Sequence, residues 1–212
     1  MSAAEHRIQL IVGLGNPGRE YEKSRHNAGF EAVDALLKVL PGKYEKKEGF
    51  SGAYWEGRFK GRNLTLLKPL TFMNLSGKSV AGLAVHNGFL PEEIMLVYDD
   101  VDLPLGKLRL RKNGGSAGHN GVESVINSLE SQKFARLRIG IGGVPRGQQI
   151  DHVLSKFSSG EQLIFDKVME TAVDAVIMAV SQGIDAAMNG FNGIEIAVEE
   201  NKESSGKAGE KN

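Results

Sequence analysis

The sequence predicts a single α/β domain with a mixed, mainly parallel, twisted sheet flanked by helices. Short apolar runs alternate with segments of helical periodicity, which is typical of parallel strands joined by helical crossovers. Two adjacent strand patterns and one strictly alternating run indicate additional antiparallel members. The chain has 212 residues, 41% of them hydrophobic, which suits one sizeable core better than two small ones.

The first half of the chain contains two predicted helices and three predicted strands. Residues 7–14, RIQLIVGL, form an apolar run that ends in a Gly-Asn-Pro-Gly turn, so we expect a buried strand. Residues 27–40 place apolar side chains at helical spacing, with Asn27 available as the N-cap. Residues 52–69 predict two strands joined by a Gly-Arg-Asn turn. A helix that ends near Gly88 follows.

The second half continues with three predicted strands. Residues 91–100 begin as a short helical turn and continue as an apolar strand over residues 94–98. Residues 107–112, KLRLRK, alternate strictly, so the leucines face the core and the basic side chains share the other face. Residues 134–142 alternate as well, which places Arg136 and Arg138 on one face.

Three helices are expected among these strands and after them. The first, GVESVINSLE, follows the glycine-rich loop at residues 113–120. A long amphipathic helix is predicted over residues 159–182, and a shorter one ends at about residue 189. The expected apolar contacts of the long helix are Leu163, Val168, Ala172, Val176 and Val180.

Composition excludes several classes of protein. The chain has no cysteine, which excludes disulfides, thiolate metal ligands and a cysteine nucleophile. No apolar run approaches the length that spans a bilayer, and the first ten residues show no signal-peptide pattern. We therefore expect a cytoplasmic protein with no membrane partner.

Charge is distributed unevenly on a chain of zero formal net charge. Residues 105–146 contain eight basic and two acidic side chains, so this segment carries about +6 and the remainder about −6. Such segregation favours a local polyanion site over general coating by nucleic acid, and a solvated basic face is the alternative. The charged residues are Lys107, Arg109, Arg111, Lys112, Lys133, Arg136, Arg138 and Arg146, against Glu123 and Glu130.

Three familiar motifs fit the sequence only in part. Glycines at residues 13–18 match the dinucleotide-binding spacing, but the segment after them lacks the apolar stripe of a crossover helix. GGSAG around Ser116 matches a nucleophile elbow, although His152, the later histidine outside that loop, directly follows an aspartate. Residues 99–102 offer three carboxylates without a close histidine pair for a metal. A serine hydrolase remains an alternative.

A water-activating arrangement fits the residues better. A histidine can act as general base when a carboxylate orients its ring, and asparagines supply neutral donors to a developing oxyanion. Ligands in parallel sheets bind beyond the carboxyl ends of strands, where Asn16 and Asp99 are expected. His26 with Asp99, surrounded by Asn16, Asn74 and Asn120, meets this requirement. A purely structural histidine is the alternative.

Six stretches occur in order from about residue 8 to residue 192: LIVGLGNPGREYEKSRHNAGF, LLKPLTFMNLSGKSV, YDDVDLPLGKLRLR, GHNG, FARLRIGIG and AMNGFN. Together they resemble the bacterial-type peptidyl-tRNA hydrolases. The resemblance implies a monomeric, phosphorylase/hydrolase-like α/β domain that hydrolyses the ester between a peptide and the terminal ribose of tRNA. It also implies that the enzyme uses no cofactor or metal, contacts tRNA phosphates and has no obligate protein partner.

The resemblance also implies roles for individual residues. His26 matches the catalytic base, Asp99 matches its partner, and Asn120 matches a residue that helps to hold the attacking water. The substrate-binding matches are Asn16, Tyr21, Met73, Asn74 and His119. The tRNA-binding matches are Arg109, Arg111 and Arg138.

The sequence departs from the usual family pattern in two places. The loop at residues 113–118 lacks the additional glycines or basic residue found in many relatives, and Gly190 stands where a larger residue is common. We predict a hydrolase domain over residues 1–193 and a polar, disordered tail over residues 194–212. A non-catalytic RNA-binding protein on the same fold is the alternative function.

Overall fold

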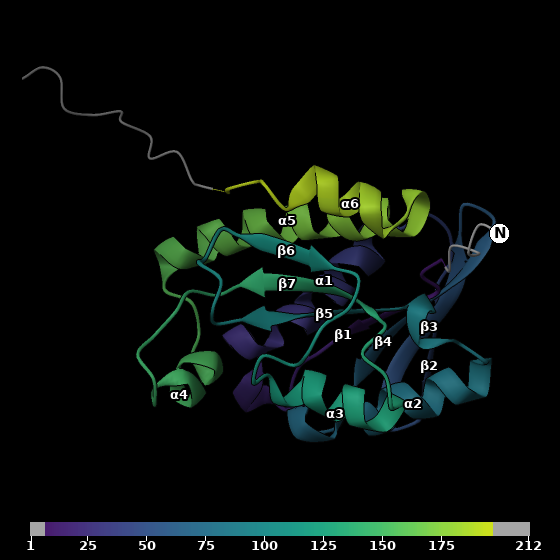
Figure 1. Ribbon diagram of the computed structural model, residues 1–212, viewed down its shortest axis with the longest axis horizontal. Coiled ribbons are helices and arrows are strands. Elements are labelled where there is room, and N and C mark those ends of the chain that lie inside the picture. Colours follow the sequence, from purple (N-terminus) through teal and green to yellow (C-terminus); the bar gives the residue numbers. More distant parts are fainter. Residues whose placement is uncertain (1–6, 197–212) are drawn as a thin grey trace, which may run out of the picture.

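The computed structural model describes residues 7–196, which form three layers (Figure 1). A seven-stranded sheet lies between α1, α5 and α6 on one face and α2 and α3 on the other. The strands are β1 (Leu10–Gly13), β2 (Glu45–Gly49), β3 (Gly52–Phe59), β4 (Arg62–Pro69), β5 (Ile94–Asp100), β6 (Leu108–Arg111) and β7 (Ala135–Gly140). The helices are α1 (Ala28–Val39), α2 (Ser76–Asn87), α3 (Asn120–Leu129), α4 (Gln149–Leu154), α5 (Ser159–Gln182) and α6 (Ile184–Phe191).

The strand order is β2-β3-β4-β1-β5-β7-β6. Strands β4, β1, β5 and β7 are parallel to one another, whereas β2, β3 and β6 join the sheet antiparallel. This confirms the predicted single domain with a mixed, mainly parallel sheet. It also places the carboxyl ends of β1 and β5 side by side at one edge, where ligand sites form in open α/β sheets.

Strand β1 is buried on both faces at the centre of the sheet. Leu10 and Val12 belong to the core under α2 and α3, while Ile11 belongs to the core under α1 and α5. A strand with both faces covered needs a continuous apolar run, which is why RIQLIVGL could be assigned from sequence. Its carboxyl end is therefore held rigidly on both sides.

The first turn of α1 lies against β1 and β5 at backbone contact distance. A Cβ atom built on Gly29 would lie 2.3 Å from the carbonyl oxygen of Val97 and 2.4 Å from the amide nitrogen of Leu14. A Cβ on Gly13 would lie 2.0 Å from the carbonyl oxygen of Gly29. Only glycine permits this approach, which brings the residues before α1 to the ends of both strands.

We expect Gly29→Ala to destabilise the fold by about 3 kcal/mol or more, because an added methyl group would meet backbone atoms that cannot move aside. Gly160→Ala in α5 is the matched control, since a Cβ there meets nothing within 4 Å. Urea unfolding of both variants measures the difference. Equal stability of the two variants would contradict the packing described for α1.

Several elements differ from the sequence prediction. The β3–β4 turn consists of Lys60 and Gly61, both with positive φ, so Arg62 already pairs with Phe59 and the predicted Gly-Arg-Asn turn was wrong. Leu163 was expected in the core but is 59% exposed, because its side of α5 faces away from the sheet. Strand β2 and helix α4 were not predicted, since both are short and β2 has no apolar side chain.

The described chain ends beside the β6 edge. Ile196 donates its backbone N–H to the carbonyl oxygen of Gly106 at 2.9 Å, and Lys107 pairs with Glu195 at 2.8 Å. Most of the predicted tail, residues 197–212, lies outside the described residues. Within residues 7–196, no helix combines the length and the apolar character needed to cross a membrane.

Candidate active site

Two histidines meet one buried carboxylate at the carboxyl edge of the sheet. Asp99, near the end of β5, is 1% exposed. His26 directs Nδ1 at both carboxylate oxygens, at 2.8 and 3.0 Å, and His119 directs Nε2 at Oδ1 at 3.1 Å. His26 comes from the short helical turn before α1, and His119 is the N-cap of α3. The structure thus brings together three residues that are distant in sequence.

The hydrogen bonds determine the tautomer of each ring. Burial alone would raise the pKa of the Asp99 carboxyl, but His26 and His119 together hold that pKa well below its usual value, so Asp99 is ionised. Nδ1 of His119 accepts from the backbone N–H groups of Gly121 (3.1 Å) and Val122 (3.3 Å), which leaves its proton on Nε2. His26 places its proton on Nδ1, so its Nε2 carries the free lone pair.

The same three residues lie close enough to hold a metal ion, with their candidate ligand atoms within 4.8 Å of one another. A metal would need the Nε2 lone pair of His119, where the hydrogen bonds place a proton. The His119 Nδ1 lone pair is already used by the first turn of α3. The geometry therefore fits a carboxylate that accepts from two histidines better than it fits a metal centre.

Polar contacts on both sides hold His26 in place. On one side, the guanidinium of Arg25 bonds Glu161 at 2.8 Å and Ser155 at 3.2 Å, and it stacks on Phe157. On the other side, Asn27 bonds both backbone groups of Asn16, at 2.7 and 3.1 Å. Asn27 occupies the N-cap position of α1 without capping it, so the predicted use of its side chain as a helix cap was wrong.

The Arg25–Glu161 pair leads to a prediction about stability and pH. Hydrogen bonds from Arg25 and Ser158 lower the pKa of Glu161 to about 2 from 4.5. A lowered native pKa stabilises the fold above the unfolded value, and this contribution disappears as pH falls from 4.5 toward 2. We expect Glu161→Gln to lower Tm at neutral pH and this difference to narrow over that range. Thermal unfolding checks this, with exposed Glu170→Gln on the same helix as control.

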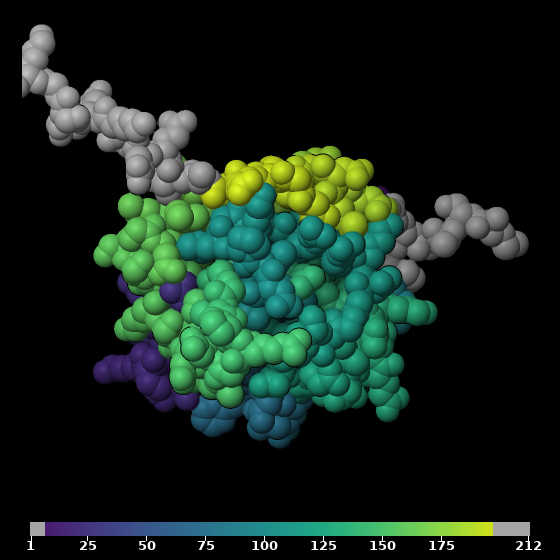
Figure 2. All heavy atoms as spheres, turned by 60° about the vertical axis from the view of Figure 1, so that its left-hand side comes forward, coloured from purple at the N-terminus to yellow at the C-terminus, as the bar shows by residue number. Residues whose placement is uncertain are grey.

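A hollow of about 350 Å³ opens beside His26 and Asp99. Its walls include Ser116 and His119 from the loop before α3, Asn120 from the start of α3, and Gln149, Ile150 and Val153 from α4. Figure 2 shows this face, where the light-green segment of α4 lies near the teal segment of residues 100–120. Ile150 is 73% exposed, so α4 offers an apolar surface at the rim. The volume lies within the range of small-ligand sites.

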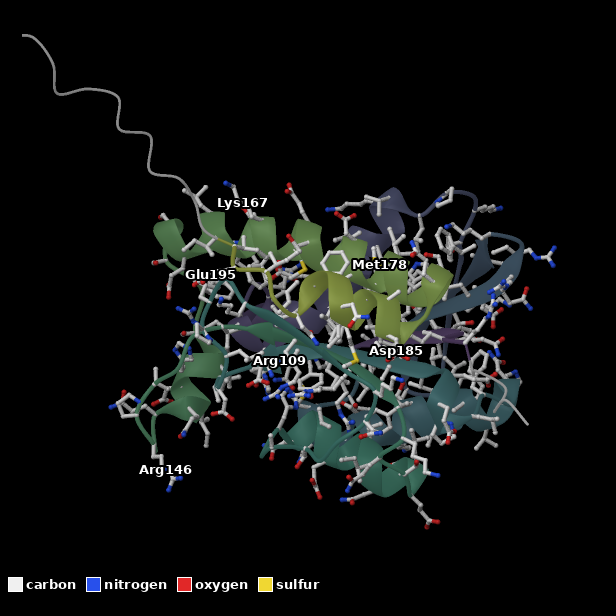
Figure 3. All side chains as sticks on the ribbon, turned by 45° about the horizontal axis from the view of Figure 1, so that its top comes forward. Arg109, Arg146, Lys167, Met178, Asp185 and Glu195 are labelled. Carbon is white, nitrogen blue, oxygen red and sulfur yellow. The ribbon has the colours of Figure 1, made fainter. Side chains whose placement is uncertain are left out.

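Arginine side chains oppose one another on the neighbouring strands β6 and β7. Arg109 lies opposite Arg138, and Arg111 opposite Arg136. Figure 3 labels Arg109 on β6, with side-chain nitrogen atoms gathered beside it. Like charges directly across a sheet destabilise it, so the Arg109–Arg138 pair favours a polyanion partner over a merely solvated face, whereas Arg136 is buried. Asp100 partly offsets the charge through its ion pair with Arg138.

Comparison with known proteins decides the family. The family model described as peptidyl-tRNA hydrolase matches residues 10–202. The chain belongs to the peptidyl-tRNA hydrolase family. It is 48% identical over 187 residues to the peptidyl-tRNA hydrolase of Caldanaerobacter subterraneus, covering 88% of this chain and 100% of the relative. The corresponding enzyme of Synechococcus sp. is 46% identical, over 91% of this chain and 86% of that one.

Solved structures agree with this family assignment. The peptidyl-tRNA hydrolase of Acinetobacter baumannii superposes with a TM-score of 0.86 at 37% identity, covering 92% of this chain and 100% of that one. A 5′-methylthioadenosine/S-adenosylhomocysteine nucleosidase of Campylobacter jejuni shares the fold alone, with a TM-score of 0.50 at 11% identity. This peptidyl-tRNA hydrolase family member therefore has the family's fold over nearly all of its described length.

The other residues predicted to bind substrate differ in their burial and in their position relative to the hollow. Asn16 is buried, and its Oδ1 accepts from the backbone N–H of Met73 at 2.8 Å. This bond leaves the Asn16 amide –NH₂ available as a donor. Tyr21 is half-buried and Asn74 is exposed. The described hollow is lined by His119 and Asn120 but not by Asn16, Tyr21, Met73 or Asn74.

Two features of the site were not assigned from sequence. Arg136 is only 2% exposed, and its guanidinium donates to the carbonyl oxygens of Gly114 and Gln132, so it holds the loop that precedes His119. Its strict alternation with Arg138 indicated a shared face but not burial. Helix α4 forms one wall of the hollow, and its six residues are too few to signal that role in the sequence.

Ser116 lines the hollow, so the serine-hydrolase alternative can be compared with the geometry. Among the described residues, His26 hydrogen-bonds only Asp99, and His119 hydrogen-bonds Asp99 and the amides of α3. In this part of the chain, neither ring forms a hydrogen bond with a serine hydroxyl. The arrangement therefore supports activation of water more than activation of Ser116.

Proposed function

We propose that this chain hydrolyses the ester bond of peptidyl-tRNA, releasing the peptide and free tRNA for recycling. The observation that carries the proposal is the His26–Asp99 pair facing a hollow of about 350 Å³ beside a surface of opposed arginines. The substrate joins an acyl ester to RNA, so its hydrolase needs a general base for the ester and a basic surface for the RNA. The relatives named above are peptidyl-tRNA hydrolases.

In the proposed mechanism, Nε2 of His26 removes a proton from a water molecule that Asn120 helps to hold. The resulting hydroxide attacks the ester carbonyl, and the peptide C–O bond to the ribose breaks. The proton held by His26 passes to the departing ribose oxygen, so water alone balances the reaction and no cofactor is required. Ionised Asp99 stabilises the imidazolium that forms between these steps.

The other predicted residues would bind the two parts of the substrate. Asn16 and Asn74 would orient the peptide backbone and the scissile carbonyl, and Tyr21, Met73 and His119 would contact the peptide beside them. Arg109, Arg111 and Arg138 would bind tRNA phosphates. Because His119 already donates to Asp99, its larger contribution would be to position that carboxylate.

The proposal extends to the setting of the enzyme. Peptidyl-tRNA arises in translation, so we propose that the protein acts in the cytoplasm, as a monomer. The catalytic domain would comprise residues 1–193. Residues 194–212 would form a polar extension, whose first residues pair with Gly106 and Lys107.

The function is tested by incubating the purified protein with N-acetylaminoacyl-tRNA and measuring release of the N-acetylamino acid above the spontaneous rate. We expect catalytic release of the blocked amino acid together with tRNA that can be charged again. Absence of release would reject the proposal. Labelling of Ser116 by a fluorophosphonate, with loss of activity in Ser116→Ala, would instead support a serine hydrolase.

The arginine surface leads to a prediction about salt dependence. We expect Arg109→Gln to weaken tRNA binding and to reduce the slope of log affinity against log salt concentration by roughly 0.7 to 0.9, as for one lost phosphate contact. Fluorescence anisotropy with labelled tRNA measures this slope. Arg146→Gln is the control, because Figure 3 shows Arg146 pointing away from β6. Equal slopes for wild type and Arg109→Gln would show that the RNA-binding site does not include Arg109.

A further inference from the structure

A series of hollows continues from the catalytic one around the β6 edge to the opposite end of the sheet. The first of these hollows shares Tyr98 and Ala117 with the catalytic hollow. The second shares Lys112 with the first, and the third shares Arg7 and Ile8 with the second. Their volumes are about 520, 370 and 440 Å³, respectively. Each hollow therefore adjoins the next along the surface.

Among the charged side chains that line these three hollows, almost all are basic. Glu92 is the one acidic residue among them, although the whole chain has equal numbers of acidic and basic residues. Two of the cations have acidic partners, since Arg138 pairs with Asp100 and Lys112 with Asp185. The basic lining residues are Arg7, Arg58, Lys60, Arg62, Arg111, Lys112, Lys133, Arg136 and Arg138.

The third hollow lies under the tip of the β3–β4 hairpin. Arg58, Lys60 and Arg62 are exposed around the two-residue turn, and Arg7 lines the same hollow. Within residues 7–196, none of these four side chains forms an ion pair, and no acidic residue lines the hollow. We call these four residues the far-edge basic surface. Concentrated, unpaired cations of this kind attract polyanions.

The far-edge basic surface lies well away from the catalytic histidine. Ile8 borders the third hollow, whereas Leu14 lies at the other end of the central strand, next to the catalytic edge. Six residues of extended chain separate them, or about 20 Å at 3.3 Å per residue. The nucleotide that carries the ester cannot reach both places. A ligand that occupies both must be an extended polyanion.

We propose that the far-edge basic surface binds backbone phosphates of the tRNA body, remote from the ester, while the acceptor end occupies the catalytic hollow. This inference rests on the proposed function, because it assigns the extended polyanion to the substrate itself. The adjoining basic hollows provide the path between the two contacts. Phosphate contacts of this kind position a nucleic acid without reading its sequence.

The test compares the double variant Arg58→Gln/Arg62→Gln with wild type. Its matched control is Lys38→Gln/Lys167→Gln, which removes two exposed cations from α1 and α5 on the covered face of the sheet. Binding of uncharged tRNA is measured by anisotropy between 50 and 200 mM salt. Turnover is measured on N-acetylaminoacyl-tRNA and on an N-acetylaminoacyl ester of a trinucleotide. Thermal unfolding checks that both variants are folded.

We expect the log–log salt slope of tRNA binding to be smaller by roughly 1.4 to 1.8 in the far-edge variant. Between 50 and 200 mM salt, the factor by which affinity falls should therefore be about ten times larger for wild type than for the variant. Its KM for the full-length substrate should rise, with kcat unchanged. Its kinetics on the trinucleotide ester should match wild type. The control variant should retain the wild-type slope.

Two results would overturn the inference: a tRNA salt slope equal to that of the control, or an equal loss of kcat/KM on the full-length and trinucleotide substrates. Failure of the proposed function has a different signature. In that case the wild-type protein would cleave neither ester, and the tRNA-binding slopes alone would still decide whether the far-edge basic surface binds RNA.

Discussion

Replacing His26 with alanine is expected to lower kcat on peptidyl-tRNA by about 10²- to 10⁴-fold, the usual contribution of a general base. His26 is 9% exposed, its Nδ1 proton is held by Asp99, and its Nε2 carries the free lone pair beside the hollow. Affinity for uncharged tRNA and its salt dependence should be unchanged, because the arginines on β6 and β7 are untouched. Single-turnover kinetics together with tRNA binding measure the two effects separately.

The matched control is His86→Ala, which removes an exposed histidine of α2 and should leave turnover at the wild-type level. Thermal unfolding is needed for His26→Ala, since the substitution leaves buried Asp99 with one hydrogen-bonding ring instead of two. A folded His26→Ala protein with near-normal turnover would reject His26 as the base. Loss of turnover together with loss of tRNA affinity would also contradict the assigned role.

Asp99→Asn is expected to lower kcat almost as much, by about 10² to 10⁴, because replacing an orienting aspartate by asparagine leaves the shape intact but selects the wrong tautomer. His119 keeps its Nε2 proton, because its Nδ1 accepts from the amides of α3. Its Nε2–H would therefore donate to the side-chain oxygen of the asparagine. The asparagine –NH₂ group would then face Nδ1 of His26. This forces the proton of His26 onto Nε2, where the lone pair is needed.

The loss in Asp99→Asn should not exceed the loss in His26→Ala, because the aspartate acts through the histidine. Combining the two substitutions should therefore cost little more than His26→Ala alone, as expected for residues that act as one unit. Asp102→Asn is the control, since this exposed carboxylate borders the same hollow. A fully active Asp99→Asn protein, or strictly additive losses, would show that Asp99 does not orient His26.

Much of the fold could be predicted because its elements bury apolar runs with clear periodicity. The centre of the sheet reads as continuous apolar sequence around Val12 and Leu96, and the outer strand β6 reads as strict alternation. Elements held by tertiary contacts were missed. Strand β2 has no apolar side chain, and helix α4 is only six residues long, too short for its apolar spacing to identify a helix.

The sequence by itself determined the class of the fold, the family motifs and the candidates His26, Asp99, His119 and Asn120. It could not determine which groups share a proton, since residues 26, 99 and 119 meet only when the α1 turn, β5 and the α3 N-terminus pack together. Burial of Arg136 and the link between Asn27 and Asn16 likewise depend on neighbours far along the chain. Local propensity reports what a segment can form, whereas a proton's position depends on distances of about 3 Å between segments, which only tertiary packing decides.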